Sequence, residues 1–123
     1  MTETRTTIAV VEDDLAVRTA LQQLLRSAAF DTLTFASAED FLSAGAVERA
    51  DLLIADVNLP GISGVALVLR LAATGSTLPV ILMTGRDDPA TRHLVGQAGP
   101  LPRLRKPFSD GDLFGAIRTA LSA

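Results

Sequence analysis

Short apolar runs and helical patterns alternate five times along the 123 residues of this chain. Each apolar run is four or five residues long and is rich in β-branched residues or leucine, which is typical of a buried strand. The segment after the first run places Leu21, Leu24 and Leu25 at helical spacing. The predicted strands span residues 7–11, 32–35, 52–55, 80–83 and 101–104.

Polar residues and a proline mark where the predicted helices begin. Asp14 and Ser37 can each cap a helix, because a side-chain oxygen there accepts a free backbone N–H. The third helix is predicted over residues 64–73. Pro89 suits the first turn of the fourth helix, where its missing N–H costs nothing, and Ser109 begins the fifth.

Five strand–helix units of this length predict an α/β protein whose parallel sheet is covered by helices on both faces. Right-handed crossovers limit the topologies, and we expect a doubly wound (βα)5 three-layer sandwich with strand order 2-1-3-4-5. The fifth strand is then an edge strand, which fits Pro102 in its run. The length suits one domain, predicted over residues 1–123.

Composition excludes several classes of protein. An apolar fraction of 48% with 20% charged residues argues against disorder. A net charge of −3 argues against a nucleic-acid surface, and the absence of cysteine excludes a disulfide scaffold and thiolate metal sites. No apolar run approaches the roughly 18 residues of a membrane span, and residues 1–5 lack a signal peptide's apolar core. We therefore expect a cytoplasmic protein without direct contact to nucleic acid or membrane.

Polar side chains follow four of the predicted strands. Glu12 and Asp13 follow the first strand, Asp56 the third, Thr84 the fourth and Lys106 the fifth. The carboxyl ends of parallel strands lie at one edge of a sheet, and ligands bind there where the strand order reverses. With the expected order, that point lies between strands 1 and 3. The sequence thus predicts one composite site from these residues.

The residue types in this site favour phosphoryl chemistry with a metal ion. Carboxylates about 4 Å apart repel by roughly 4 kcal/mol per pair at an effective dielectric near 20, so a raised pKa or a bound cation is expected. Mg²⁺ suits oxygen-only ligands, and the backbone carbonyl of Asn58 can add another oxygen. The Asp56 carboxylate can act as a nucleophile toward phosphorus. Lys106 can pair with a phosphoryl oxygen, and Thr84 can donate a hydrogen bond to one.

The sequence resembles response-regulator receiver domains, the phosphoacceptor modules of two-component signalling. The resemblance extends from residue 10 to about residue 121, and residues 35–42 resemble the FixJ-like branch of that family. Four motifs in this order and spacing carry it: VVEDD at residues 10–14, DVNLPGISG at 56–64, MTG at 83–85 and KPF at 106–108.

This resemblance implies a flavodoxin-like fold and a phosphorylatable switch rather than a turnover enzyme, with self-phosphorylation and autodephosphorylation allowed. Asp56 would accept the phosphoryl group from a sensor histidine kinase. Glu12 and Asp13 would hold Mg²⁺, while Thr84 would sense the phosphoryl group and Lys106 would bind it. The fourth helix, fifth strand and fifth helix would signal to a downstream partner, and the domain could form a homodimer on phosphorylation.

Two features depart from the family pattern. Arg103 stands three residues before Lys106, where the family usually carries Tyr or Phe. We expect its side chain to project to solvent or to a partner's acid, with a changed output face as the result. In the third helix, Val65, Ala66 and Leu69 form a second apolar stripe, which could mark a dimer or partner surface.

Other functions remain open at this stage. One is a binding module of receiver shape that is not phosphorylated. Another is an aspartate-nucleophile phosphatase, although such enzymes typically need a second Asp where this chain has Asn58. A flavin-binding protein of similar topology is disfavoured because Trp and Tyr are absent. We expect His93 to lie at the surface without a catalytic role.

Overall fold

The computed structural model describes residues 5–85 and 87–122, so residues 1–4, where no signal-peptide core is expected, lie outside it. Its helices are α1 (Leu15–Ser27), α2 (Ala38–Ser43), α3 (Gly64–Ala73), α4 (Pro89–Gln97) and α5 (Asp110–Ser122), with a short 3₁₀ helix η1 (Ala46–Glu48). No helix in these two ranges is long and apolar enough to span a membrane. Its strands are β1 (Thr7–Val11), β2 (Asp31–Phe35), β3 (Leu52–Asp56), β4 (Val80–Thr84) and β5 (Arg103–Arg105).

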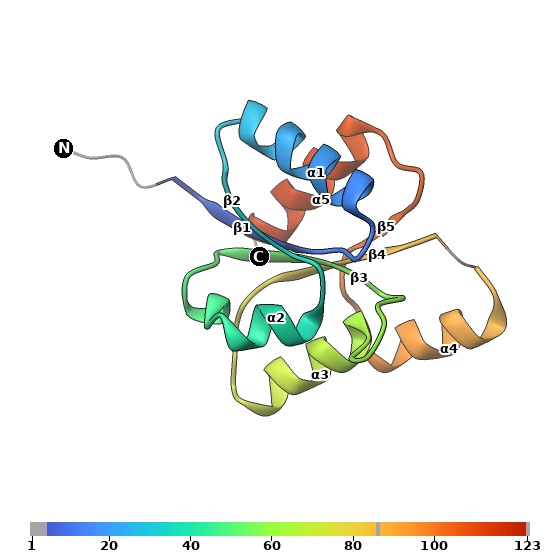
Figure 1. Cartoon of the computed structure of the whole chain (residues 1–123). Coiled ribbons are helices and arrows are strands. Elements are labelled where there is room, and N and C mark those ends of the chain that lie inside the picture. The colour runs from blue at the N-terminus through green and yellow to red at the C-terminus, as the bar shows by residue number, and fades with distance from the viewer. Residues whose placement is uncertain (1–4, 86, 123) are drawn as a thin grey trace.

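The five strands form one parallel sheet of order β2-β1-β3-β4-β5, as predicted. Helices α1 and α5 cover one face, and α2, α3 and α4 cover the other (Figure 1). This is the expected three-layer sandwich. The connections carry the chain across the sheet so that β3 lies at its centre, between β1 and β4.

The central strands are apolar throughout because both of their faces are buried. In β1, Ile8 and Val10 pack into the core on the α1–α5 side, whereas Ala9 and Val11 pack into the core on the other side. All four side chains are 0% exposed. Successive strand residues point to opposite faces, so a strand buried on both sides has a continuous apolar sequence.

Helix starts are where sequence capping signals place them. Asp14 Oδ1 accepts a hydrogen bond from Val17 N at 3.1 Å, and Ser37 Oγ accepts one from Asp40 N at 3.1 Å. Ser109 caps α5 through its Oγ, which accepts from a backbone N–H in the first turn. These bonds satisfy donors that have no partner within the helix, so local sequence is enough to predict them.

The fifth strand differs from its predicted position. It spans Arg103–Arg105 rather than residues 101–104, and Pro102 precedes it. Leu104 is 4% exposed and is the one residue of β5 in the core. Pro102 still contributes its carbonyl, which accepts a hydrogen bond from Leu82 N at 3.0 Å. Pairing with β4, rather than the apolar run itself, therefore sets the register of this strand.

The predicted second apolar stripe of α3 is only partly a surface feature. Val65 is 0% exposed and belongs to the core, whereas Leu69 is 46% exposed. The expectation was wrong for Val65 because α3 inserts into the core between α2 and α4 (Figure 1). A dimer at this face stays a prediction.

Gly64, the first residue of α3, lies so close to β3 that a side chain does not fit. A Cβ atom there would lie 2.2 Å from the Asp56 carbonyl oxygen, which is far inside van der Waals contact. We expect Gly64→Ala to lower the free energy of unfolding by about 1–3 kcal/mol, the usual range for overpacking, in urea denaturation.

Gly115→Ala in α5 is the matched control, because nothing lies within 4 Å of the added Cβ. It should raise stability by about 0.5–1 kcal/mol through the lower entropy of the unfolded chain. Equal effects of the two substitutions would contradict the close approach at Gly64.

Candidate functional site

The pairing of β1 with β3 brings the acidic residues together at the carboxyl edge of the sheet. Val11 pairs with Ala55, so the residue after each, Glu12 and Asp56, lie side by side. Carboxylate oxygens of Glu12, Asp13 and Asp56 all lie within 4.8 Å of one another. Glu12 is 0% and Asp56 6% exposed, while Asp13 is exposed to solvent. The three carboxylates thus extend from the core outward.

Lys106 directly follows β5, the edge strand of the sheet, and its side chain reaches this cluster. Its Nζ donates to Asp56 Oδ2 at 3.1 Å and forms an ion pair with Glu12 Oε1. Its backbone N donates to the Thr84 carbonyl at 2.8 Å, which continues the pairing of β5 with β4. One cation therefore contacts two buried carboxylates, and this offsets part of their mutual repulsion.

The proton affinities in this cluster are shifted by burial and by neighbouring charges. Burial raises the pKa of Glu12 to about 7, and the hydrogen bond from Lys106 only partly opposes this. Burial alone would lower the pKa of the Lys106 ammonium. Its hydrogen bonds to Glu12 and Asp56 outweigh that effect, so the pKa of Lys106 is raised above its usual value. The Lys106 ammonium is therefore held in its charged form.

The loop after β3 is held against Asp56 by its own backbone. Asn58 N donates to Asp56 Oδ1 at 3.1 Å, and Gly64 N donates to the Val57 carbonyl at 3.1 Å. The backbone of Asn58 therefore lies beside the Asp56 carboxylate. Its carbonyl as a metal ligand, like the Thr84 hydroxyl as a phosphoryl contact, stays a prediction.

Two further residues support the site and were not predicted from the sequence. Arg18 Nη1 donates to the Glu12 carbonyl at 2.8 Å and so fixes the turn that carries the first acids. Glu39 Oε2 accepts from Ile62 N at 3.4 Å in the loop after β3. Glu39 also lies where a Cβ on Gly61 would be, at 2.3 Å. Neither contact leaves a local sequence signal, because the partners lie on different elements.

Arg103 lies apart from the acidic cluster. Its side chain is exposed, as predicted, and Nη2 donates to the Gly99 carbonyl at 3.3 Å. His93 is also exposed. Glu12, Asp56 and Lys106 thus lie together in the structure, whereas Arg103 lies on β5 at the edge of the sheet.

The donor set of the cluster fits a hard divalent cation. Glu12, Asp13 and Asp56 offer only carboxylate oxygens, which Mg²⁺ prefers, and the exposed Asp13 leaves the site open to water.

Beside the acidic cluster, a groove of about 640 Å³ lies between α1 and the segment that follows β5. Its walls are mainly apolar and include Ala20 and Phe108.

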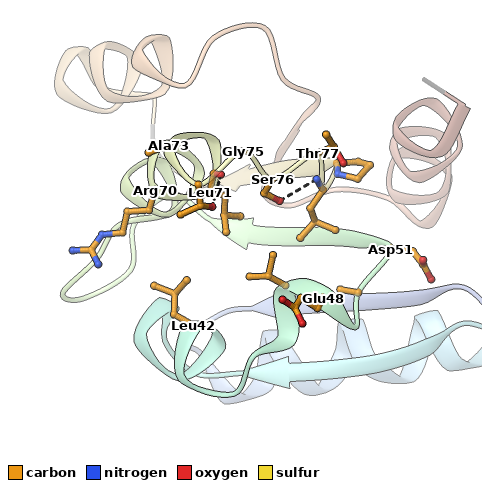
Figure 2. A pocket seen from close by; sticks show the side chains of 14 residues that line it. Leu42, Glu48, Asp51, Arg70, Leu71, Ala73, Gly75, Ser76 and Thr77 are labelled. Atoms are coloured by element: carbon orange, nitrogen blue, oxygen red, sulfur yellow. Dashed lines mark hydrogen bonds between the residues drawn. The ribbon is translucent and has the colours of Figure 1, made fainter.

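A separate hollow of about 1050 Å³ lies at the opposite, amino-terminal edge of the sheet. Figure 2 shows that its walls come from α2, η1 and α3, with Leu42, Glu48 and Arg70 around it. Asp51 and Pro79, which also line it, directly precede β3 and β4. The hollow is therefore separated from the acidic cluster by the length of these strands.

Known proteins are similar to this chain in sequence and in fold. A family model described as the response regulator receiver domain matches residues 8–118. The response regulator protein TmoT of Ectopseudomonas mendocina is 37% identical over 121 residues, which cover 98% of this chain and 55% of TmoT. The transcriptional regulatory protein FixJ of Azorhizobium caulinodans is 38% identical over 112 residues, which cover 91% of this chain and 53% of FixJ.

Solved structures agree with these relatives. The crystal structure of FixJ-N has a TM-score of 0.84 at 29% identity, covering 98% of this chain and 96% of that one. The response regulator StyR has a TM-score of 0.84 at 37% identity, covering 97% of this chain and 60% of that one. The chain spans about half the length of the curated relatives it matches.

The raised pKa of Glu12 makes stability depend on pH. Without divalent cations, folded Glu12 keeps its proton up to a pKa of about 7, while the unfolded chain releases it near 4.5. The stability that protonated Glu12 contributes to the fold is therefore complete below about pH 4.5 and is lost as the pH rises through 7. In urea denaturation with EDTA, we expect Glu12→Gln to flatten this decline.

Glu48→Gln is the matched control, because Glu48 is an exposed glutamate of η1. It should leave the pH dependence of the unfolding free energy as it is in the unsubstituted chain. If the unfolding free energies of all three proteins fall in parallel between pH 4.5 and 7, Glu12 is not the group that causes the decline.

Proposed function

The chain belongs to the response regulator receiver domain family, whose members are phosphorylatable signalling switches, and on this premise we propose that Asp56 is its phosphoacceptor. The observation that carries the proposal is the contact of Lys106 Nζ with Asp56 Oδ2 at 3.1 Å, beside two further acids. Asp56 combines a nucleophilic carboxylate with an adjacent cation.

The proposed step is transfer of a phosphoryl group from a phosphohistidine. An Asp56 oxygen attacks phosphorus, the phosphorus–nitrogen bond breaks, and its electron pair stays on the imidazole nitrogen. Lys106 is within reach of a phosphoryl oxygen on Asp56 because its Nζ already contacts that carboxylate. Thr84 ends β4 beside Lys106, where its hydroxyl can donate to a second phosphoryl oxygen.

We propose that Glu12, Asp13 and Asp56 hold Mg²⁺, with the Asn58 carbonyl as an additional ligand. When bound there, Mg²⁺ would neutralise charge on the phosphoryl oxygens during transfer. Buried Glu12 supplies the inner wall of the site, and Asp13 supplies its solvent side. Small phosphodonors would react at the same carboxylate, so the domain can phosphorylate itself without being a turnover enzyme.

We propose a sensor histidine kinase as the phosphodonor and the cytoplasm as the location. The apolar groove between α1 and the segment after β5 supports a protein donor, because it opens directly beside Lys106. Leu15, at the start of α1, is 66% exposed and adds apolar surface near the site. A phosphohistidine on a docked helix would then reach Asp56.

The signal would leave through α4, β5 and α5. Two new hydrogen bonds to a charged phosphoryl group, from Thr84 and Lys106, are each worth roughly 1.5–3 kcal/mol. Their sum approaches the 5.5 kcal/mol or so needed to move a two-state equilibrium from 1:99 to 99:1. The downstream partner and phosphorylation-dependent dimerisation belong to the same proposal.

Phosphorylation itself is testable with intact-protein mass spectrometry. With Mg²⁺ and acetyl phosphate, we expect the chain to gain one phosphoryl group, and EDTA should prevent this. Asp56→Asn should gain none because an amide is not a nucleophile of comparable strength. Asp51→Asn, an exposed aspartate at the other edge of the sheet, is the control and should be phosphorylated normally. An unmodified wild-type chain would refute the proposal in favour of an unphosphorylated binding module.

The docking groove predicts a separation between protein and small-molecule donors. Ala20→Glu places a carboxylate among apolar groove residues, so we expect about tenfold slower transfer from a histidine kinase that phosphorylates the unsubstituted chain. Phosphorylation by acetyl phosphate should keep its rate. Thr19→Glu, an exposed neighbour that does not line the groove, should slow neither reaction. Equal kinase rates for both variants would contradict docking at this groove.

A further inference from the structure

We propose that Arg18 is a positioning residue for divalent-cation binding: its guanidinium fixes the backbone that presents Asp13, and it thereby sets the affinity of the acidic site for Mg²⁺. The inference rests on the proposed Mg²⁺ site of Glu12, Asp13 and Asp56. It adds a residue that cannot touch the ion itself, because a guanidinium has only donors.

Asp13 lies between two residues that Arg18 binds. Arg18 Nη1 donates to the Glu12 carbonyl oxygen at 2.8 Å, and Arg18 N donates to the Asp14 carbonyl oxygen at 2.9 Å. Within the same turn, Asp14 N donates to Glu12 Oε2 at 3.4 Å. Arg18 of α1 therefore closes the turn that joins β1 to α1, and Asp13 is the residue at the middle of this turn.

The Glu12 carbonyl needs the partner that Arg18 supplies. Glu12 follows the last residue of β1 and is 0% exposed. Its N–H donates to the Phe35 carbonyl of β2 at 3.0 Å, so the backbone of Glu12 is held by β2 on one side and by Arg18 on the other. A buried carbonyl without a donor is costly, so loss of the guanidinium would release or shift the turn.

The Asp13 carboxylate is available although its backbone is held. It has no hydrogen-bond or ion-pair partner among residues 5–85 and 87–122, whereas Glu12 and Asp56 both contact Lys106. An Asp13 oxygen already lies within 4.8 Å of the oxygens of both other acids. Mg²⁺ demands near-ideal octahedral geometry, so motion of the turn must stop when the ion binds. A turn that Arg18 fixes in advance loses less entropy on binding.

Neither charge nor helix stability explains a cation at this position. By charge alone, Arg18 would repel Mg²⁺ from the neighbouring acids. It is the fourth residue of α1, near the helix end that favours negative charge. No described carboxylate forms an ion pair with it. The hydrogen bond to Glu12 remains, and it predicts the opposite sign: loss of the Arg18 guanidinium weakens Mg²⁺ binding.

The test is an NMR titration of the isotope-labelled chain with MgCl₂, followed through the backbone amide signals of Asp13 and Asp56. Arg18→Met keeps an unbranched apolar stem without a donor, and we expect it to weaken Mg²⁺ binding about tenfold, as is usual for residues that orient metal ligands. Arg18→Lys should recover most of the affinity. Arg26→Met removes the same charge from α1, where Arg26 Nε donates to Thr32 Oγ1 at 3.3 Å, and should leave the affinity unchanged.

Phosphorylation by acetyl phosphate supplies a second readout. Arg18→Met should raise the Mg²⁺ concentration for the half-maximal rate about tenfold, in proportion to the lost affinity. The rate at saturating Mg²⁺ should stay unchanged, because the contact of Lys106 with Asp56 does not involve Arg18. Should Arg18→Met not give a folded spectrum, Arg18→Gln, which also lacks the charge, takes its place and should likewise weaken binding.

Three outcomes would overturn the inference. These are equal Mg²⁺ affinities for the Arg18→Met and Arg26→Met variants, tighter binding by Arg18→Met, and an Arg18→Met rate that stays low at saturating Mg²⁺. The unsubstituted chain separates the two proposals. If MgCl₂ leaves its Asp13 and Asp56 signals unchanged, the Mg²⁺ site itself is refuted, whereas normal binding with an affinity independent of Arg18 refutes only the positioning role.

Discussion

The parallel pairing of β1 with β3 is the contact on which the site depends. These strands are 40 or more residues apart in the chain, yet Val11 lies opposite Ala55. Both are buried on both faces, so the hydrophobic cores on either side hold them in one register. A shift of one residue would turn apolar side chains out of both cores. That register in turn places Glu12 next to Asp56 and lets the fold gather like charges at one point.

Gathering these acids costs electrostatic free energy, and the rest of the sheet supplies the compensation. β4 and β5 carry Lys106 to the cluster, where one ammonium contacts both Glu12 and Asp56. Full burial of Glu12 then raises its pKa to about 7, because water no longer solvates its charge. A site with close carboxylates and an adjacent cationic side chain suits binding of a divalent ion and of a phosphoryl group. The divalent ion would relieve the repulsion between the carboxylates, and the Lys106 ammonium would balance negative charge on the phosphoryl group.

Features that depend on interactions between residues close in the sequence, such as helix caps and helix bounds, were predicted correctly. Asp14 and Ser37 cap their helices as expected because a capping side chain bonds to a residue three positions on. The bounds of α3 also match the prediction, since its apolar spacing and Gly64 lie within one segment. β5 was placed too early because its register depends on β4, which lies some 20 residues away. Arg18 and Glu39 were missed for the same reason: each supports the site through a contact between different elements.

The sequence alone determined the order of the elements, the class of fold and the chemical types at the strand ends, because these follow from short-range periodicity and residue identity. It also marked Arg103 as a departure from the family pattern. Only the tertiary structure decided that Glu12 is buried while Asp13 is exposed, that Lys106 contacts two acids, and that Val65 belongs to the core. Burial and proximity depend on neighbours that are distant in the chain. Their effects on charge and packing therefore become definite only when the strands are paired.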